Sequence, residues 1–264
     1  MELTGRRAIV TGASSGIGEE LGLQLGAKRC KVALSARRKD RLEETATRVR
    51  AAGGEALVVE ADVAREADCK RLVEEAVKAF GGLDLLVCNA GTSMTARFDE
   101  VTDLSLFERL MAVNYLGAVY CTGYALPHLK KSRGTIAVVS SLFGKLVAPT
   151  RTGYAATKHA LHGFYDCLRL ELADSGVQVT LVCPALVATE IRQVAATGSG
   201  TPSGREPHDA RKIMSAAECA RQSLRAIEQG KNELLMTASG KFGVKMRTFF
   251  PGLVDAMVAR RVVR

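Results

Sequence analysis

The chain has 264 residues, of which 47% are hydrophobic and 25% charged, a balance typical of a globular protein; disordered and collagen-like classes are therefore excluded. Lys and Arg outnumber Asp and Glu by 37 to 28, and the formal net charge of +9 favours anionic ligands. This charge alone does not distinguish between a nucleic acid, a phosphate-bearing cofactor and a membrane surface.

Short apolar runs rich in β-branched residues recur along the chain and predict seven strands. Because these runs lack a clean polar alternation, we expect both faces of each strand to be covered. Segments with a helical period, such as 41–51 and 69–80, lie between them. The alternation predicts an α/β fold with a doubly wound (Rossmann) parallel sheet of about seven strands and helices on both faces. The predicted strands are 8–10, 32–34, 56–59, 83–88, 135–140, 177–183 and 233–236.

The first strand leads directly into a glycine-rich turn and then into a helix predicted from Glu19. Glycines permit a sharp turn and a close approach to a pyrophosphate, and the free N–H groups at the helix start meet its negative charge. The turn is not a Walker A loop and differs from the GxGxxG spacing, but its place between strand and helix predicts nucleotide binding. The expected contacts are Gly12, Ser14, Ser15, Gly16, Ile17 and Gly18.

The residues after the second strand predict which dinucleotide binds. A site that prefers NAD usually has an acidic residue about 20 residues after the glycines. Here residues 35–39 read Ser-Ala-Arg-Arg-Lys, and Asp40 is expected in the first turn of the next helix. Arg37 can stack on adenine and pair bidentately with a 2′-phosphate, and Arg38 or Lys39 adds charge. We therefore predict NADP(H) as the cofactor.

Tyr154 and Lys158 are spaced i, i+4 on a helix predicted to run to about Leu172, so both side chains lie on one face. A tyrosine pKa near 10 makes a poor base and a slow acid at neutral pH, whereas a neighbouring ammonium favours the phenolate. Ser140 and Ser141 stand at a strand end upstream, Ser141 by thirteen residues. These residue types predict general acid/base chemistry.

With these motifs, the sequence resembles the short-chain dehydrogenase/reductase family over nearly its whole length. The resemblance implies that Tyr154 is the general acid/base and that Ser141 hydrogen-bonds the substrate oxygen. Lys158 would also hold the nicotinamide ribose, and Asn114 would keep a proton-relay water in place. Of the two serines, the family's thirteen-residue spacing selects Ser141.

The same resemblance implies further cofactor contacts. Asp62 and Val63 would contact adenine. Thr189 would contact the carboxamide of the nicotinamide, and Val187 belongs to the same cofactor-binding segment. The floor of the cofactor site would be formed by Asn89, Ala90 and Gly91. One departure is Pro184-Ala185, where the family usually has Pro-Gly.

The predicted function is hydride transfer between NADP(H) and a ketone or secondary alcohol. The ending at 231–264 lacks the Asp-Gly-Gly of acyl-carrier-protein reductase-like members and is similar to members that reduce lipid or steroid ketones, so a hydrophobic substrate is expected. One alternative is a 3-oxoacyl thioester reductase, for which a basic surface suits an acidic carrier or coenzyme A. Another is a non-catalytic NADP(H)-binding sensor. No nucleic-acid partner is expected, because the cations are dispersed and Trp is absent.

The strand and helix pattern has no linker, so residues 1–264 are predicted to form a single dinucleotide-binding and catalytic domain. Residues 190–212 follow a strand's carboxyl end and are predicted to be a substrate lid, with a passive loop as the alternative. Residues 238–264 form a basic amphipathic tail that Pro251-Gly252 divides into two pieces. This tail suits either an anionic membrane surface or a contact within the domain or with a second subunit; family precedent favours a homodimer or homotetramer.

Seven dispersed cysteines without a CxxC pair exclude a disulfide framework or a zinc ribbon and favour a reducing cytosol. His159 and His162 lie three apart, but no neighbouring Cys or carboxylate in the sequence completes a set, so no metal is predicted. No secretion signal and no apolar run of the roughly 18 residues needed for a spanning helix is found. We expect a cytoplasmic protein, with peripheral membrane contact through the tail as an option.

Overall fold

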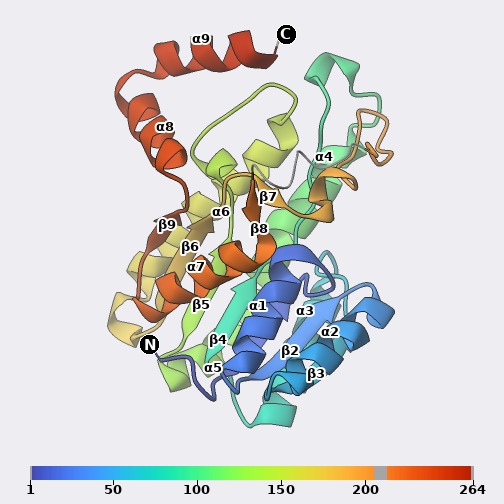
Figure 1. Cartoon of the computed structure of the whole chain (residues 1–264), viewed down its shortest axis with the longest axis vertical. Helices are drawn as coiled ribbons and strands as arrows, with labels where there is room; N and C mark the ends of the chain where they lie inside the picture. Colours follow the sequence, from blue (N-terminus) through green and yellow to red (C-terminus); the bar gives the residue numbers. More distant parts are fainter. Residues whose placement is uncertain (1, 205–212, 263–264) are drawn as a thin grey trace.

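A computed structural model describes residues 2–204 and 213–262 of the chain. Its central sheet has seven parallel strands in the order β3-β2-β1-β4-β5-β6-β9, which confirms the predicted doubly wound fold (Figure 1). The strands are β1 (Arg7–Thr11), β2 (Lys31–Ala36), β3 (Glu55–Glu60), β4 (Leu85–Cys88), β5 (Thr135–Val139), β6 (Gln178–Cys183) and β9 (Glu233–Leu235).

Helices cover both faces of the sheet. One face carries α1 (Gly16–Ala27), α2 (Lys39–Ala51) and α7 (Ala216–Glu228), and the other carries α3 (Glu66–Phe80), α5 (Gly117–Ser132) and α6 (Thr152–Glu171). Before α5 come α4 (Ser105–Met111) and a π-helical turn, Ala112–Leu116. The chain continues through α8 (Ala238–Phe249) into α9 (Pro251–Val262), which extend beyond the sheet layers (Figure 1).

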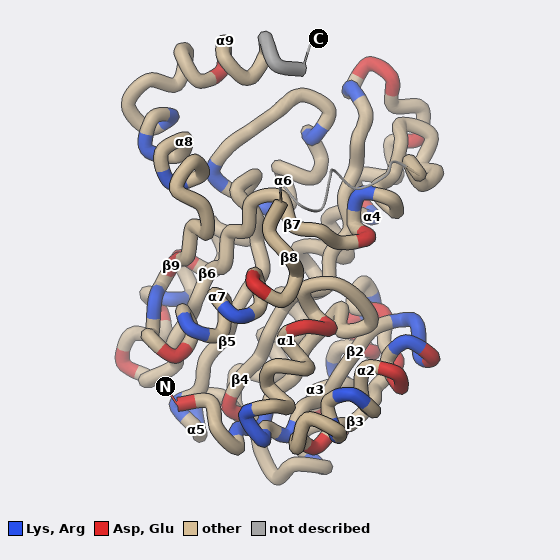
Figure 2. Tube along the Cα trace, viewed as in Figure 1, with Lys and Arg blue, Asp and Glu red and all other residues tan. Residues whose placement is uncertain are grey.

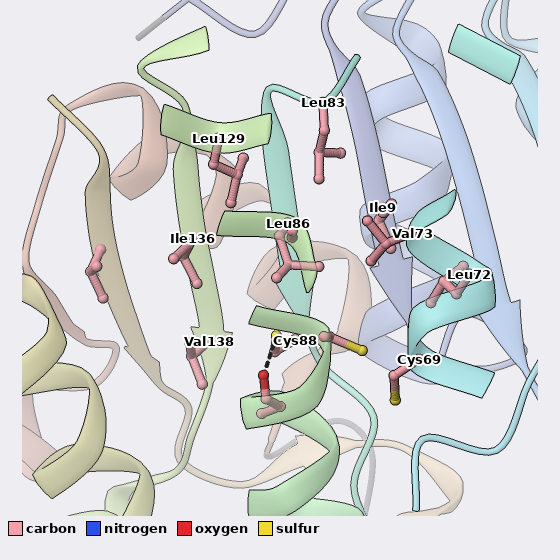
Figure 3. Close-up of a cluster of buried hydrophobic side chains, with 14 of the residues drawn as sticks. Ile9, Cys69, Leu72, Val73, Leu83, Leu86, Cys88, Leu129, Ile136 and Val138 are labelled. Carbon is pink, nitrogen blue, oxygen red and sulfur yellow. Dashed lines mark hydrogen bonds between the residues drawn. The ribbon is translucent and has the colours of Figure 1, made fainter. Parts of the chain in front are cut away.

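Each strand contributes alternate side chains to two separate cores, because its neighbouring side chains point to opposite faces. In the core under α3, α5 and α6, Leu72 and Leu129 pack against Ile9, Leu86 and Ile136 of the strands (Figure 3). These five side chains are fully buried. The two-sided burial explains why the strand sequences are continuously apolar.

The structure differs from the sequence prediction at element starts and in one small sheet. α1 begins at Gly16 rather than Glu19, and α3 begins at Glu66 rather than 69. A single first turn is too short to show a repeat of apolar residues, so the sequence does not mark where these helices begin. Two short strands, β7 (Val187–Ala188) and β8 (Met214–Ser215), pair with each other and were not predicted. Two residues are too few to show a period.

The order of the strands determines where ligands bind. β1 and β4 are neighbours from which the crossovers run in opposite directions, so the loops that follow them diverge and leave a crevice at their carboxyl ends. The glycine-rich turn follows β1, and Asn89 follows β4. In the described residues, no helix is long and apolar enough to cross a membrane.

Candidate active site

The loop after β4 holds the glycine-rich turn in place. Thr11 Oγ1 accepts the N–H groups of Asn89 at 3.0 Å and Ala90 at 3.1 Å, and Asn89 Nδ2 donates to the Thr11 carbonyl at 2.9 Å. A Cβ on Gly12 would lie 2.8 Å from Ala90 Cα, and one on Gly18 would lie 2.2 Å from the Gly12 carbonyl oxygen. Side chains are therefore excluded at both glycines, and the expected floor residues Asn89 and Ala90 fix the turn.

The amino end of α1 faces the segment that follows β7. Gly16 has a φ of +60°, and a Cβ there would lie 2.9 Å from Thr189 Cγ2. Thr189 thus lies directly on the glycine-rich turn, next to the free N–H groups of the first helical turn. The Val187 side chain is buried in an apolar cluster with Val182, and Ile17 packs against that cluster. The side chains of Val187 and Ile17 therefore contribute to hydrophobic packing.

Arg38, at the amino end of α2, spans the same turn. Its guanidinium donates to Ser15 Oγ at 2.8 Å, to Ser14 Oγ at 3.2 Å and to the Glu190 carboxylate at 3.1 Å. Arg37 instead lines a cavity of about 520 Å³ at the β3 edge of the sheet, together with Asp62 and other residues. The structure therefore brings Arg38, rather than Arg37, to the loop serines. Glu190 was not identified from the sequence, where no local pattern marks it.

Asp62 and Val63 follow β3 and differ in their surroundings. Asp62 Oδ1 accepts the Ala64 N–H at 3.1 Å, which turns the chain beside the cavity that Asp62 lines. Val63 is 7% exposed, and a Cβ on Gly117 would lie 2.8 Å from its Cβ. Val63 therefore packs against the start of α5, while Asp62 faces the opening.

Ser141 and Tyr154 meet at the carboxyl end of β5. Ser141 Oγ accepts the Phe143 N–H at 3.1 Å, and the Phe143 ring packs edge-on against Tyr154 with centroids 6.0 Å apart. Burial raises the pKa of the Tyr154 phenol, and this outweighs the hydrogen bond with Ser141 and the charge of Arg151, which lower it. The surroundings of Tyr154 therefore favour the neutral phenol over the phenolate.

Lys158 lies one turn further along α6. Its Nζ is 5.7 Å from the centre of the Tyr154 ring and donates to the Val139 carbonyl at 3.0 Å, in a position only 4% exposed. Burial lowers the pKa of Lys158 to about 8. The net shift of the Tyr154 pKa is thus upward and not downward as the ammonium alone predicts, because burial disfavours the charged form of both groups.

Asn114 lies in the π-helical turn, where the Gly117 N–H bonds the Ala112 carbonyl, a widening that is frequent at functional sites. It is 1% exposed. Asn114 Oδ1 accepts the Thr92 N–H at 2.7 Å, while Nδ2 donates to the Thr92 carbonyl at 2.9 Å and to Thr157 Oγ1 at 3.0 Å. The side chain thus joins the loop after β4 to α6.

Gly91 lies between the cofactor motif and the catalytic residues. A Cβ there would lie 3.3 Å from Asn114 Oδ1 and 3.8 Å from Lys158 Nζ. Ser140, in contrast, has a buried Oγ with no hydrogen-bond partner. At Gly91 the loop after β4 therefore lies close to both Asn114 and Lys158.

The predicted lid is described only as far as residue 204, and its remainder at 205–212 lies outside the described residues. Thr95 donates its N–H to the Ala196 carbonyl at 2.8 Å, and Ala196 donates to the Ser93 carbonyl at 2.9 Å. Thr102 donates to the Gly198 carbonyl at 3.0 Å. These bonds attach the described part of 190–212 to the segment that leads into α4.

A glycine turn at the point where the strand order reverses, beside a Ser-Tyr-Lys group, defines a dinucleotide-binding oxidoreductase. A family model described as short chain dehydrogenase matches residues 6–199. The chain belongs to this family, and it is accordingly an oxidoreductase that uses a nicotinamide cofactor and acts on small molecules.

Two relatives cover most of the chain. The dehydrogenase/reductase SDR family protein 7-like of Dictyostelium discoideum is 36% identical over 253 residues, which cover 94% of this chain and 78% of that protein. The 11-beta-hydroxysteroid dehydrogenase-like 2 of Arabidopsis thaliana is 33% identical over 259 residues, which cover 97% and 81%. Both support the family assignment over nearly the full chain.

Two solved structures have the same fold. An alcohol dehydrogenase from Thermococcus sibiricus, complexed with 5-hydroxy-NADP, is 26% identical with a TM-score of 0.74, covering 87% of this chain and 94% of its own. A short chain dehydrogenase/reductase from Burkholderia phymatum, in complex with NAD, is 24% identical with a TM-score of 0.85, covering 97% of both chains. This second likeness concerns the fold alone.

Proposed function

We propose that the protein transfers hydride between NADP(H) and a hydrophobic ketone or secondary alcohol. The observation that carries this proposal is the grouping of Ser141, Tyr154 and Lys158 at the end of β5, beside the glycine-rich turn. The turn fits a dinucleotide, since Gly12 and Gly18 have no room for a side chain and the amino end of α1 offers N–H groups to a pyrophosphate.

The nicotinamide supplies or accepts the hydride when it is bound. The chain's own part is to orient the substrate and move a proton. Ser141 is near enough to lower the pKa of the Tyr154 phenol, so both hydroxyls can donate to one substrate carbonyl oxygen. Tyr154, whose pKa is raised, then gives its proton to the developing alkoxide. Lys158, held by Val139, supplies positive charge under the phenol ring.

The choice of NADP(H) rests on the cations at the end of β2. Arg38 reaches Ser14 and Ser15 of the turn, and Arg37 lies beside Asp62, so two guanidinium groups flank the region where an adenosine ribose would bind. A guanidinium is the preferred partner of a phosphate. The two solved structures carry NAD in one case and an NADP derivative in the other, so the fold alone does not determine the cofactor.

The hydrophobic substrate is supported by the surroundings of Ser141. A Cβ on Gly240 would lie 2.7 Å from Leu142 Cδ1, so α8 covers the segment that follows Ser141. Leu186, two residues after Pro184, is 50% exposed, and Val194 is 53% exposed. The name of the Arabidopsis thaliana relative refers to an 11-beta-hydroxysteroid dehydrogenase, and steroids are hydrophobic substrates.

The test is a panel of aliphatic, aromatic, steroid and lipid ketones together with 3-oxoacyl thioesters, followed by NADPH absorbance. We expect turnover of apolar ketones with NADPH preferred over NADH. Turnover confined to thioesters would instead favour the acyl-thioester alternative. Cofactor binding without turnover of any compound would favour the sensor and contradict our proposal.

We also propose that the tail contacts a second subunit, in a homodimer or homotetramer. Large apolar side chains are exposed on α8, on α9 and at the residue between them. These side chains are Phe242, Phe249, Phe250, Leu253 and Met257, at 47 to 67% exposure. Figure 2 shows that α8 also carries Lys and Arg positions. Residues 263 and 264 of the tail lie outside the described residues. An anionic membrane surface is the alternative occupant.

One experiment distinguishes the two occupants of the tail. Truncation after Ser239 should convert the oligomer to a monomer in sedimentation, with no retention of the full chain on anionic vesicles. Retention on anionic but not neutral vesicles, weakened by salt, would overturn the subunit proposal.

A cytoplasmic location is also proposed, supported by the free thiols of all seven cysteines.

A further inference from the structure

A second cluster of reactive side chains lies behind the active site. His162 on α6, Cys183 at the end of β6 and Glu233 at the start of β9 place one ligand-type atom each within 4.8 Å of one another. Cys183 Sγ lies 3.6 Å from His162 Nε2, and His162 Nδ1 lies 3.5 Å from Glu233 Oε1. These three residues are far apart in the sequence, so no local sequence motif predicts the cluster.

Two buried polar atoms in this region have no hydrogen-bond partner in the structure. They are His162 Nδ1, in a residue 6% exposed, and Ser140 Oγ, in a residue 4% exposed. Unpartnered buried polar atoms are rare, because each loses its bonds to water without replacement. A Cβ on Gly144 would lie 2.6 Å from His162 Nε2 and 2.9 Å from Ser140 Oγ, so only glycine fits beside these two side chains.

The distances match a zinc site. With Zn–N near 2.0 Å and Zn–S near 2.3 Å, a tetrahedral ion separates its nitrogen and sulfur ligands by about 3.5 Å. The observed separation of His162 Nε2 and Cys183 Sγ is 3.6 Å. Glu233 is only partly buried, so its carboxylate can turn toward the ion and away from Lys145, which lies 2.8 Å from Oε1. A thiolate, an imidazole and a carboxylate suit Zn²⁺.

We propose that His162, Cys183 and Glu233 form a binding site for Zn²⁺. The thiolate is the form of Cys183 that binds the ion, so binding displaces the thiol proton, which passes to the solvent. A bound ion connects α6 to β6 and β9, one helical turn beyond Lys158.

The test is titration of the full-length protein with Zn²⁺ in competition with a chromophoric chelator, and with Co²⁺ to observe the thiolate charge-transfer band. We expect one tight site per chain with a thiolate band. Cys183→Ala should remove the band, and both Cys183→Ala and His162→Gln should weaken Zn²⁺ by about tenfold or more. Glu233→Gln, at a partly exposed position that tolerates change, should keep the band but weaken the affinity.

The same helix offers matched controls. His159 and Cys167 are exposed on α6, and His159→Gln and Cys167→Ala should leave both the affinity and the band unchanged. Absence of a thiolate band in the wild type, or equal losses in the control variants, would overturn the proposal. His162 would then be a neutral core histidine that donates to or accepts from Cys183.

Discussion

The two halves of the sheet build their sites in different ways. On the β1–β3 side, contacts come from glycine backbone and from exposed cations; the Arg38 side chain is 47% exposed and its partner Glu190 is 46% exposed. On the β5–β6 side, Asn114 and Lys158 are at most 4% exposed and fixed by hydrogen bonds. Exposed charges respond to the ligand, whereas buried groups are held in place, so the first half should control cofactor choice and the second the chemistry.

The substitution Tyr154→Phe should distinguish most clearly between the half of the sheet that controls the chemistry and the half that controls cofactor choice. It removes the proton donor but keeps the ring that packs on Phe143, so turnover should fall about 100-fold or more while NADPH affinity stays within a few-fold. Steady-state kinetics and fluorescence titration measure the two quantities. Tyr124→Phe, which loses only a surface bond to Glu66, is the control. Unchanged turnover in Tyr154→Phe would contradict the proposed role of Tyr154 as the proton donor.

A smaller effect is expected from the cofactor half. Arg37→Ala and Arg38→Ala should each weaken NADPH by about tenfold or more, because a charge-assisted bond to phosphate contributes about 1.5–3 kcal/mol. NADH affinity should change little, and kcat should hold. Arg41→Ala, on the exposed face of α2, is the control. Equal losses for both cofactors would contradict the assignment of these cations to the 2′-phosphate.

The opposite end of the sheet provides a region that should affect neither half. Asp84 is 4% exposed and accepts bonds from Arg7 at 2.7 and 2.8 Å; burial opposes its charge, but these bonds hold the pKa of Asp84 below its usual value. Asp84→Asn should therefore lower the free energy of unfolding at pH 7 by about 2 kcal/mol, with cofactor selectivity intact.

The pH dependence of this effect has a definite sign. Because the folded pKa of Asp84 lies below the unfolded value, its stabilisation is present above the unfolded pKa and is lost as pH falls through the folded pKa. Urea unfolding of wild type and Asp84→Asn should converge in acid. Asp99→Asn, at an exposed pair with Arg97, should show almost no difference at any pH. A constant gap between the Asp84 curves would contradict the ion-pair explanation.

The smallest expected effect concerns Glu190. Its carboxylate competes with a phosphate for Arg38, so Glu190→Gln should tighten NADPH by about two- to fivefold, the range of an exposed ion pair. NADH affinity should not change, because NADH carries no 2′-phosphate. Isothermal titration with both cofactors measures the difference. Weaker NADPH binding in this variant would mean that Glu190 positions Arg38 instead of competing for it.

The sequence by itself determined the features that depend on local spacing. Apolar runs on both faces marked the strands, the glycines of the first turn followed from their place after β1, and the i, i+4 step brought Tyr154 and Lys158 to one side of α6. Such patterns are readable because helix and strand periods are properties of the backbone. The starts of α1 and α3 were missed for the same reason, since a first turn shows no period.

Only the tertiary structure decided which distant side chains meet and how deeply they are buried. Arg38 and Glu190 lie far apart in the chain, as do His162, Cys183 and Glu233, and nothing local to either set predicts the contact. Burial also reversed the expected direction of the Tyr154 pKa, because desolvation depends on every neighbour packed around the phenol and not on the lysine one turn away. Long-range packing sets the solvation of each group, and solvation sets its charge.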